Sequence, residues 1–183
     1  WAIIQDLANG LGLGWNYVEG NALGQDFKTR GARCGEQIEL LKRFWTGETI
    51  SYNGRFEQAE RVRLNPAPNR SIPVWIGGFA PQAIERAGRL ADGFIEAGPV
   101  ENAIDVMKGV DTAREKHGRA DQPFGHTFVT LMSQNEDDAV ASAEKWREAG
   151  GTHVSMTTMG MGLGTEVNAH LDAIGRLGDR LGV

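Results

Sequence analysis

The pattern that most constrains this chain is a succession of strand, glycine turn and helix that recurs from Ser71 onward. The first copy is SIPVWIGGFAPQAIERAGRLA, Ser71 to Ala91. Its apolar run, which ends at Ile76, is rich in β-branched and aromatic residues, as is typical of a buried strand. Gly77 and Gly78 end that run, and Pro81 suits the first turn of a helix. We therefore predict a strand, a tight turn and a helix in direct succession.

Three further copies follow the first one. Strands are predicted over residues 92–97, 125–132 and 152–158, and helices over residues 100–117, 136–149 and from Thr165 onward. Asn135 is predicted to cap the 136–149 helix, and the last helix is predicted to bury Leu171, Ile174, Leu177 and Leu181. Such alternation requires parallel strands joined by right-handed crossovers, so the fold class is α/β. The pattern alone fits either a doubly wound sheet or a (β/α) barrel.

The region before Ser71 has a different organisation. A helix is predicted from Thr29 to Thr46, with an apolar face formed by Cys34, Ile38, Leu41, Phe44 and Trp45. Asn53-Gly54 predicts a small hairpin, and a proline-containing loop follows it. Residues 1–25 are the least regular, and GLGLGW (Gly10 to Trp15) fits either a strand end that approaches a ligand or a flexible glycine loop.

The first strand, turn and helix also form the best candidate for a ligand site. A strand that leads through glycines into a helix N-terminus points free backbone N–H groups and the positive end of the helix dipole at one place. An anion, typically a phosphate, is bound at such a place. The alternative is a tight turn that binds nothing.

Composition and cysteine content exclude several classes of function. The net charge is −5, with 19 basic and 24 acidic residues, and the basic residues form no stripe, so a nucleic-acid partner is not expected. The apolar runs are too short to cross a bilayer. Cys34 is the single cysteine, which excludes a disulfide framework and suggests a small core residue. We expect a cytoplasmic protein that binds no nucleic acid and no membrane.

The histidines do not indicate a metal site or a catalytic group. No two of them have the spacing of metal ligands, so no protein-bound metal is predicted. Each is interpreted as structural: His117 at a helix C-terminus, His126 and His153 at strand starts, and His170 on a helix. Arg30 and Arg33, near a helix start, are interpreted as surface residues.

Several segments together resemble a known family. They are GLGLGWN (Gly10 to Asn16), residues 22–48, YNGRF (Tyr52 to Phe56), residues 73–95 and THVSMTTMGMGL (Thr152 to Leu163). In this order they resemble the C-terminal half of the bacterial luciferase-like monooxygenases, and within that family the oxidoreductases that use the deazaflavin coenzyme F420. The resemblance covers nearly the whole chain.

The resemblance implies a (β/α)8 TIM barrel, here an incomplete one of about four to five βα units. Residues 1–183 would form a single luciferase-like domain that lacks the N-terminal βα units. Coenzyme F420, or FMN as the alternative, would lie at the C-terminal mouth of the barrel. Its phosphate would be held by Gly77, Gly78, Phe79 and Ala80, and Gly14 and Trp15 would lie beside its ring or the substrate. Asp92-Gly93 would form a structural turn beside the mouth, and Thr157 and Thr158 are weaker site candidates.

The resemblance implies a flavin- or F420-dependent oxidoreductase that transfers a hydride to a small organic substrate. The family's active-site histidine and acidic residues belong to the units without a counterpart here, so the catalytic residues are unknown. Two rival hypotheses stay open. One is a truncated, non-catalytic barrel fragment that needs a partner chain or the N-terminal half, with a homodimer formed through open sheet edges. The other is a phosphate-binding βα domain unrelated to redox chemistry.

Overall fold

The computed structural model describes residues 26–131 and 133–183, so the predicted ligand residues Gly14 and Trp15 lie outside the described part. Four strands form one parallel sheet in the order β3-β4-β5-β6. They are β3 (Trp75–Gly77), β4 (Gly93–Ala97), β5 (Gly125–Val129) and β6 (His153–Ser155). A helix follows each strand: α4 (Pro81–Leu90), α5 (Val100–Lys116), α6 (Glu136–Glu148) and α7 (Val167–Leu181). The predicted fourfold alternation is confirmed, although β5 and β6 are shorter than predicted.

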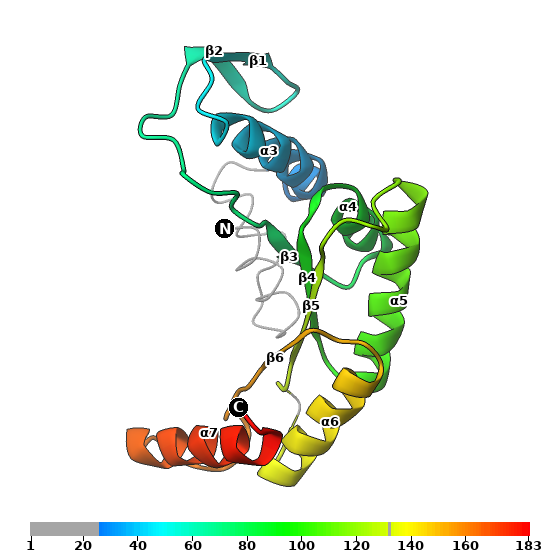
Figure 1. Cartoon of the computed structure of the whole chain (residues 1–183), viewed down its shortest axis with the longest axis vertical. Helices are drawn as coiled ribbons and strands as arrows, with labels where there is room; N and C mark the ends of the chain where they lie inside the picture. The colour runs from blue at the N-terminus through cyan, green and yellow to red at the C-terminus, as the bar shows by residue number, and fades with distance from the viewer. Residues whose placement is uncertain (1–25, 132) are drawn as a thin grey trace.

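The helices α4, α5 and α6 lie on one face of the sheet, on the right in Figure 1. One core cluster joins Ile76 and Phe94 of the strands to Ala87 of α4 and Val110 of α5. A second cluster joins Phe128 of β5 to α5 and to Trp146 of α6. Within the described residues the helices that follow these strands cover one face, as in the wall of a (β/α) barrel, whereas a doubly wound sheet carries helices on both faces.

On the opposite face of the sheet, which we call the open face, the described strands carry one large aromatic side chain, that of Trp75. Side chains alternate along a strand, so Trp75 points to this face while Ile76 points to the helices. The Trp75 indole lies across Gly93 and Gly125 of the neighbouring strands, and its ring meets His153 edge-on with centroids 5.2 Å apart. These residues begin their strands, so Trp75 covers the amino-end of the open face.

A helix and a hairpin precede the sheet. The helix α3 (Arg30–Phe44) follows a single 3-10 turn, η1 (Phe27–Thr29), and contributes Ile38 to the core beside α4. The hairpin consists of β1 (Ile50–Asn53) and β2 (Gln58–Val62), as predicted. The Glu36 carboxylate of α3 accepts the backbone N–H groups of the hairpin turn, with distances of 3.1 Å to Arg55, 3.0 Å to Phe56 and 2.7 Å to Glu57. This carboxylate therefore fastens the hairpin to the helix.

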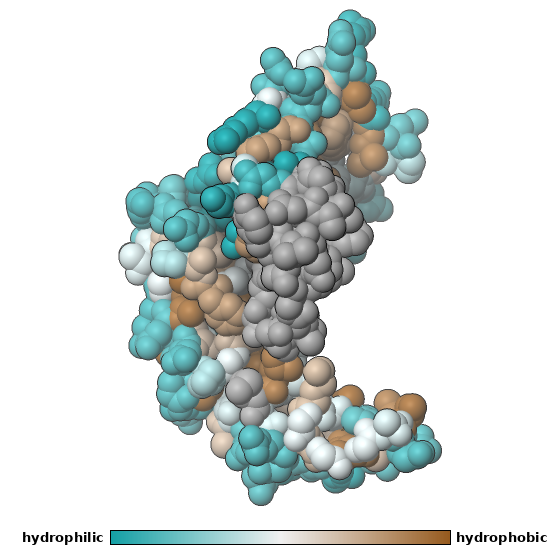
Figure 2. Space-filling view, turned by 180° about the vertical axis from the view of Figure 1, so that it is seen from behind, coloured by the Kyte–Doolittle hydropathy of each residue, from teal (hydrophilic) through white to brown (hydrophobic). Residues whose placement is uncertain are grey.

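Several sequence predictions about helix faces were wrong. In α3 the buried residues are Gly35, Ile38 and Leu40, and Leu41 is 44% exposed. In α7 the buried residues are Ala173 and Leu177, whereas Leu171 and Ile174 are 59% and 46% exposed. Figure 2 shows apolar atoms among the exposed atoms of the projecting arm at lower right, which is α7. In both helices, the face that packs against neighbouring elements is narrower than the face formed by the apolar residues.

Asp92-Gly93 is structural, as predicted, but it lies at the other end of the sheet. Asp92 directly precedes β4, so it belongs to the amino-end and not to the mouth. Its carboxylate accepts the Val74 backbone N–H at 2.9 Å and contacts Lys42 Nζ at 3.0 Å and an Arg119 guanidinium nitrogen at 3.3 Å. Asp92 thereby joins α3, the entry to β3 and the segment after α5. Within the described residues, no helix is long and apolar enough to cross a membrane.

Candidate functional site

The predicted phosphate residues lie together between β3 and α4, at the carboxyl end of the sheet. Gly77 ends β3, and a Cβ built there would lie 3.1 Å from the Ile95 carbonyl oxygen of β4. Gly78 has a φ of +141°, a conformation that glycine adopts readily and other residues rarely. Phe79 is 55% exposed, and Ala80 is the exposed N-cap of α4. The glycines therefore allow a close backbone turn whose outer side faces solvent.

The start of α4 suits an anion better than the starts of α5 and α6 do. Ala80 has no side chain that could cap the helix, and the first turn of α4 contains no acidic residue. By contrast, the first turn of α5 contains Glu101, and that of α6 contains Glu136, Asp137 and Asp138. Carboxylates at a helix N-terminus neutralise the dipole and repel an anion. Among these three helices, only the positive end of α4 is left without a compensating side chain.

Thr157 and Thr158 follow β6 at the same carboxyl end, but their hydroxyls serve the local structure. The Thr158 hydroxyl lies 2.6 Å from Nδ1 of His170, whose Nε2 lies 3.1 Å from the Gly164 carbonyl oxygen. Thr157 Oγ1 accepts the Met159 backbone N–H at 3.2 Å. These contacts hold the loop between β6 and α7, and they confirm the structural role predicted for His170.

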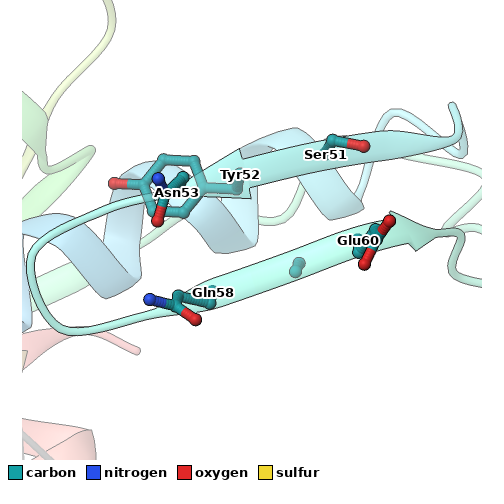
Figure 3. Close-up of a pocket in the computed structure, with 6 residues that line it drawn as sticks. Ser51, Tyr52, Asn53, Gln58 and Glu60 are labelled. Carbon is teal, nitrogen blue, oxygen red and sulfur yellow. The ribbon is translucent and has the colours of Figure 1, made fainter.

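Two pockets lie away from this turn. One, of about 580 Å³, opens on the hairpin between β1 and β2 and is lined by Ser51, Tyr52, Asn53, Gln58, Ala59 and Glu60 (Figure 3). The other, of about 480 Å³, lies at the amino-end, beside Lys42, Trp45, Arg70 and Asp92. Neither pocket includes a residue of the 77–80 turn, so the candidate phosphate site rests on the backbone of that turn and on the end of α4.

A buried polar cluster lies between the sheet and α5. Glu96 of β4 has a side chain with 0% exposure, and its Oε1 lies 2.8 Å from Nδ1 of His126 on β5. The other ring nitrogen of His126, Nε2, lies 3.2 Å from Oδ1 of Asp111 on α5. Asp111 also forms an ion pair of 2.8 Å with Arg114, whose guanidinium lies over the Phe124 ring. These side chains face the helices, on the opposite side of the sheet from the open face.

Burial and pairing shift the proton affinity of this cluster. Burial raises the pKa of Glu96 to about 7, although the hydrogen bond from His126 opposes the rise. For His126, burial alone would lower the pKa, but the hydrogen bond and charge of Glu96 together with Asp111 raise it overall. Sequence reasoning correctly took His126 as structural but missed Glu96. A lone carboxylate in the otherwise apolar run Gly93–Ala97 was the feature that could have revealed it.

Comparisons with known proteins match these features to a family. The profile of the luciferase-like monooxygenases matches residues 7–176, which is most of the chain. The chain belongs to the luciferase-like monooxygenase family. An F420-dependent secondary alcohol dehydrogenase, solved with an F420–acetone adduct, has the same fold: the TM-score is 0.69 at 10% identity, over 85% of this chain and 63% of that one. This likeness confirms the predicted TIM-barrel fold class.

Curated relatives of this luciferase-like chain include F420-dependent enzymes. An F420-dependent glucose-6-phosphate dehydrogenase of Mycolicibacterium fortuitum is 32% identical over 140 residues, which are 74% of this chain and 42% of the relative. An uncharacterized protein of Mycobacterium tuberculosis is 34% identical over 126 residues, which are 67% of this chain and 43% of the relative. The chain thus spans less than half the length of these two relatives.

Proposed function

We propose that this luciferase-like protein is an F420-dependent oxidoreductase that transfers a hydride between the deazaflavin and a small organic substrate. One structural observation carries the proposal: the uncapped, acid-free start of α4 follows a glycine turn at the carboxyl end of the sheet. TIM-barrel enzymes build their active sites at that end. The F420-dependent relatives support the choice of F420 over FMN, with which oxygenation would be the alternative reaction.

The chain's own residues would hold the phosphate-bearing side chain of the coenzyme. The backbone N–H groups around Gly78 and Phe79 would donate to phosphate oxygens, and the dipole of α4 would favour the negative charge. The deazaflavin, when bound, supplies or accepts the hydride. Trp75 covers the amino-end of the open face. The deazaflavin ring and the substrate would therefore lie at the carboxyl end of that face. The catalytic acid or base is not assigned to any described residue.

A matched pair of variants at Gly78 tests the proposal. Any side chain at this position is strained by the φ of +141°, so Gly78→Asn reports the strain and Gly78→Asp adds a negative charge to the same strain. We expect F420, followed by its ring fluorescence, to bind the wild type in a saturable manner. Gly78→Asp should weaken binding at least about tenfold more than Gly78→Asn, a difference of about 1.4 kcal/mol. Equal weakening by the two variants would contradict a phosphate at this turn.

The same titration addresses the remaining alternatives. Tighter binding of FMN than of F420 would favour an FMN-dependent monooxygenase. A folded protein that binds neither coenzyme would favour the non-catalytic fragment. A homodimer through the edges of β3 and β6 also stays a prediction, and the mass of the protein in solution tests it. The cytoplasmic location stays a prediction as well.

A further inference from the structure

The cluster of Glu96, His126 and Asp111 takes no part in the proposed coenzyme site. Its three residues come from β4, β5 and α5, and they lie on the helix side of the sheet. The residues that face His126 with a charge are Glu96 from β4 and Asp111 from α5, and Arg114 of α5 pairs with Asp111 in turn. The cluster therefore spans the interface between α5 and the centre of the sheet.

The geometry fixes which proton arrangement is favourable. Both ring nitrogens of His126 face carboxyl oxygens, so between two ionised carboxylates both contacts are hydrogen bonds only when His126 carries two protons. Both contacts are also hydrogen bonds when Glu96 is protonated at Oε1 and donates to Nδ1, while a neutral His126 donates from Nε2 to Asp111. Glu96 Oε2 is buried and has no hydrogen-bond partner. An ionised Glu96 would therefore keep part of its charge uncompensated inside the protein, which is costly. The cluster therefore needs one proton between Glu96 Oε1 and Nδ1 of His126, in addition to the proton between Nε2 and Asp111.

We propose that Glu96, His126 and Asp111 form a proton-operated lock that fastens α5 to β4 and β5. In the closed state a proton occupies each contact, one between Glu96 Oε1 and Nδ1 and one between Nε2 and Asp111. When the proton between Glu96 and His126 is lost, a bare ring nitrogen faces the buried, charged carboxylate of Glu96. The contact between α5 and the sheet weakens. This inference does not depend on the proposed coenzyme or reaction.

The direction of the pH effect follows from the two pKa shifts. Both pKa values are raised in the folded protein, so the folded state binds more protons than the unfolded state. The stability that each group contributes is fully present below its ordinary pKa and is lost as the pH rises through the folded pKa. For Glu96 this window runs from about 4.5 to about 7. The lock is closed in mild acid and released above neutral pH.

The release would reach the carboxyl end of the sheet through the start of α5. Only Gly98 and Pro99 separate the end of β4 from Val100, the first residue of α5. Looser packing of α5 therefore frees the loop that follows β4, at the same end of the sheet as the 77–80 turn. The lock would couple pH to the mobility of one wall of the barrel mouth.

Hydrogen exchange of the α5 amides at pH 5 and pH 8 tests the lock. After correction for the intrinsic exchange rate, the opening equilibrium of α5 should rise by more than about tenfold in the wild type, because the raised pKa of Glu96 makes the folded state bind more protons than the open state. The α6 amides serve as an internal reference. Glu96→Gln carries a permanently neutral group of the same shape, so its rise should shrink to less than about tenfold.

The matched control is Glu85→Gln. Glu85 also pairs with a histidine, His117, at 2.8 Å, but its side chain is 44% exposed. This variant should keep the wild-type pH profile. A wild type without a pH effect on α5, or the same flattening in Glu85→Gln as in Glu96→Gln, would overturn the lock. If Glu96→Gln fails to fold, Asp111→Ala removes the hydrogen-bond acceptor on α5, and its α5 amides should already be less protected at pH 5 than those of the wild type. Protection equal to wild type would overturn the lock as well.

Discussion

Because the Trp75 indole lies against Gly93, we predict that a single methyl group added at Gly93 will destabilise the protein. A Cβ built at Gly93 would lie 2.3 Å from Cδ2 of the indole and 2.5 Å from Cε2 and Cε3. Ordinary carbon contacts are about 3.5–4.0 Å, so the ring would have to move by more than about 1 Å. Gly125 limits that movement, because its own Cβ position lies 2.1 Å from the far edge of the same ring.

The expected magnitude follows from two opposing effects. Overpacking of this kind costs about 1–3 kcal/mol. Replacing glycine by alanine also restricts the unfolded chain, which stabilises by about 0.4–1 kcal/mol. We therefore expect Gly93→Ala to lower the free energy of unfolding by about 1–2 kcal/mol. Urea denaturation followed by far-UV circular dichroism measures this difference.

A control and a rescue make this prediction specific. Gly109 lies inside α5, and its Cβ position is 3.6 Å from Ile84, an ordinary contact. Gly109→Ala should therefore stabilise the protein by about 0.5–1 kcal/mol, because alanine favours the helix. In the Trp75→Leu background, Gly93→Ala should cost less than in the wild type. If Gly93→Ala is neutral, or if Trp75→Leu does not reduce its cost, the proposed position of the indole is refuted.

Two further predictions concern the two ends of the sheet. Ala80→Ser should cap α4 and raise the free energy of unfolding by about 0.5–2 kcal/mol with little loss of F420 binding. Ala80→Asp should give a similar gain in stability but weaken F420 binding, because it adds a negative charge at the start of α4. Thermal denaturation measures the stability, and ring fluorescence measures the binding. Asp92→Asn should lower the free energy of unfolding by about 1–3 kcal/mol, because Lys42 and Arg119 lose their shared carboxylate. This loss should be smaller in a Lys42→Met background. Unchanged stability in urea denaturation would contradict this role of Asp92.

The sequence predicted the alternation and the glycine turn because both depend on local chemistry. The apolar run before Gly77 and Pro81 at the start of a helix each favour one local structure over others. The choice of a barrel over a doubly wound sheet depends on which face the helices cover, and helical periodicity does not encode that choice. It entered only through the family resemblance, and the likeness to the solved F420-dependent secondary alcohol dehydrogenase confirms it.

The failed predictions depend on contacts between distant segments. Leu171 and Ile174 have the spacing of a buried stripe, but α7 meets its neighbour mainly through Ala173 and Leu177. Glu96, His126 and Asp111 are separated by 15 to 30 residues along the chain, and the register of β4 against β5 together with the packing of α5 on the sheet brings them together. Asp92 was placed at the wrong end because the turn that precedes a strand belongs to the amino-end of a parallel sheet.

The most direct test of the coenzyme site is to compare F420 with the corresponding deazaflavin that lacks the phosphate. Amide resonances of the 15N-labelled protein report where each compound binds. We predict that F420 shifts the Gly78 and Phe79 amides, and that the phosphate-free compound binds at least about tenfold more weakly and leaves these two amides nearly unchanged. Equal affinities for the two compounds, or shifts confined to the hairpin pocket around Tyr52, would contradict a phosphate site at the start of α4.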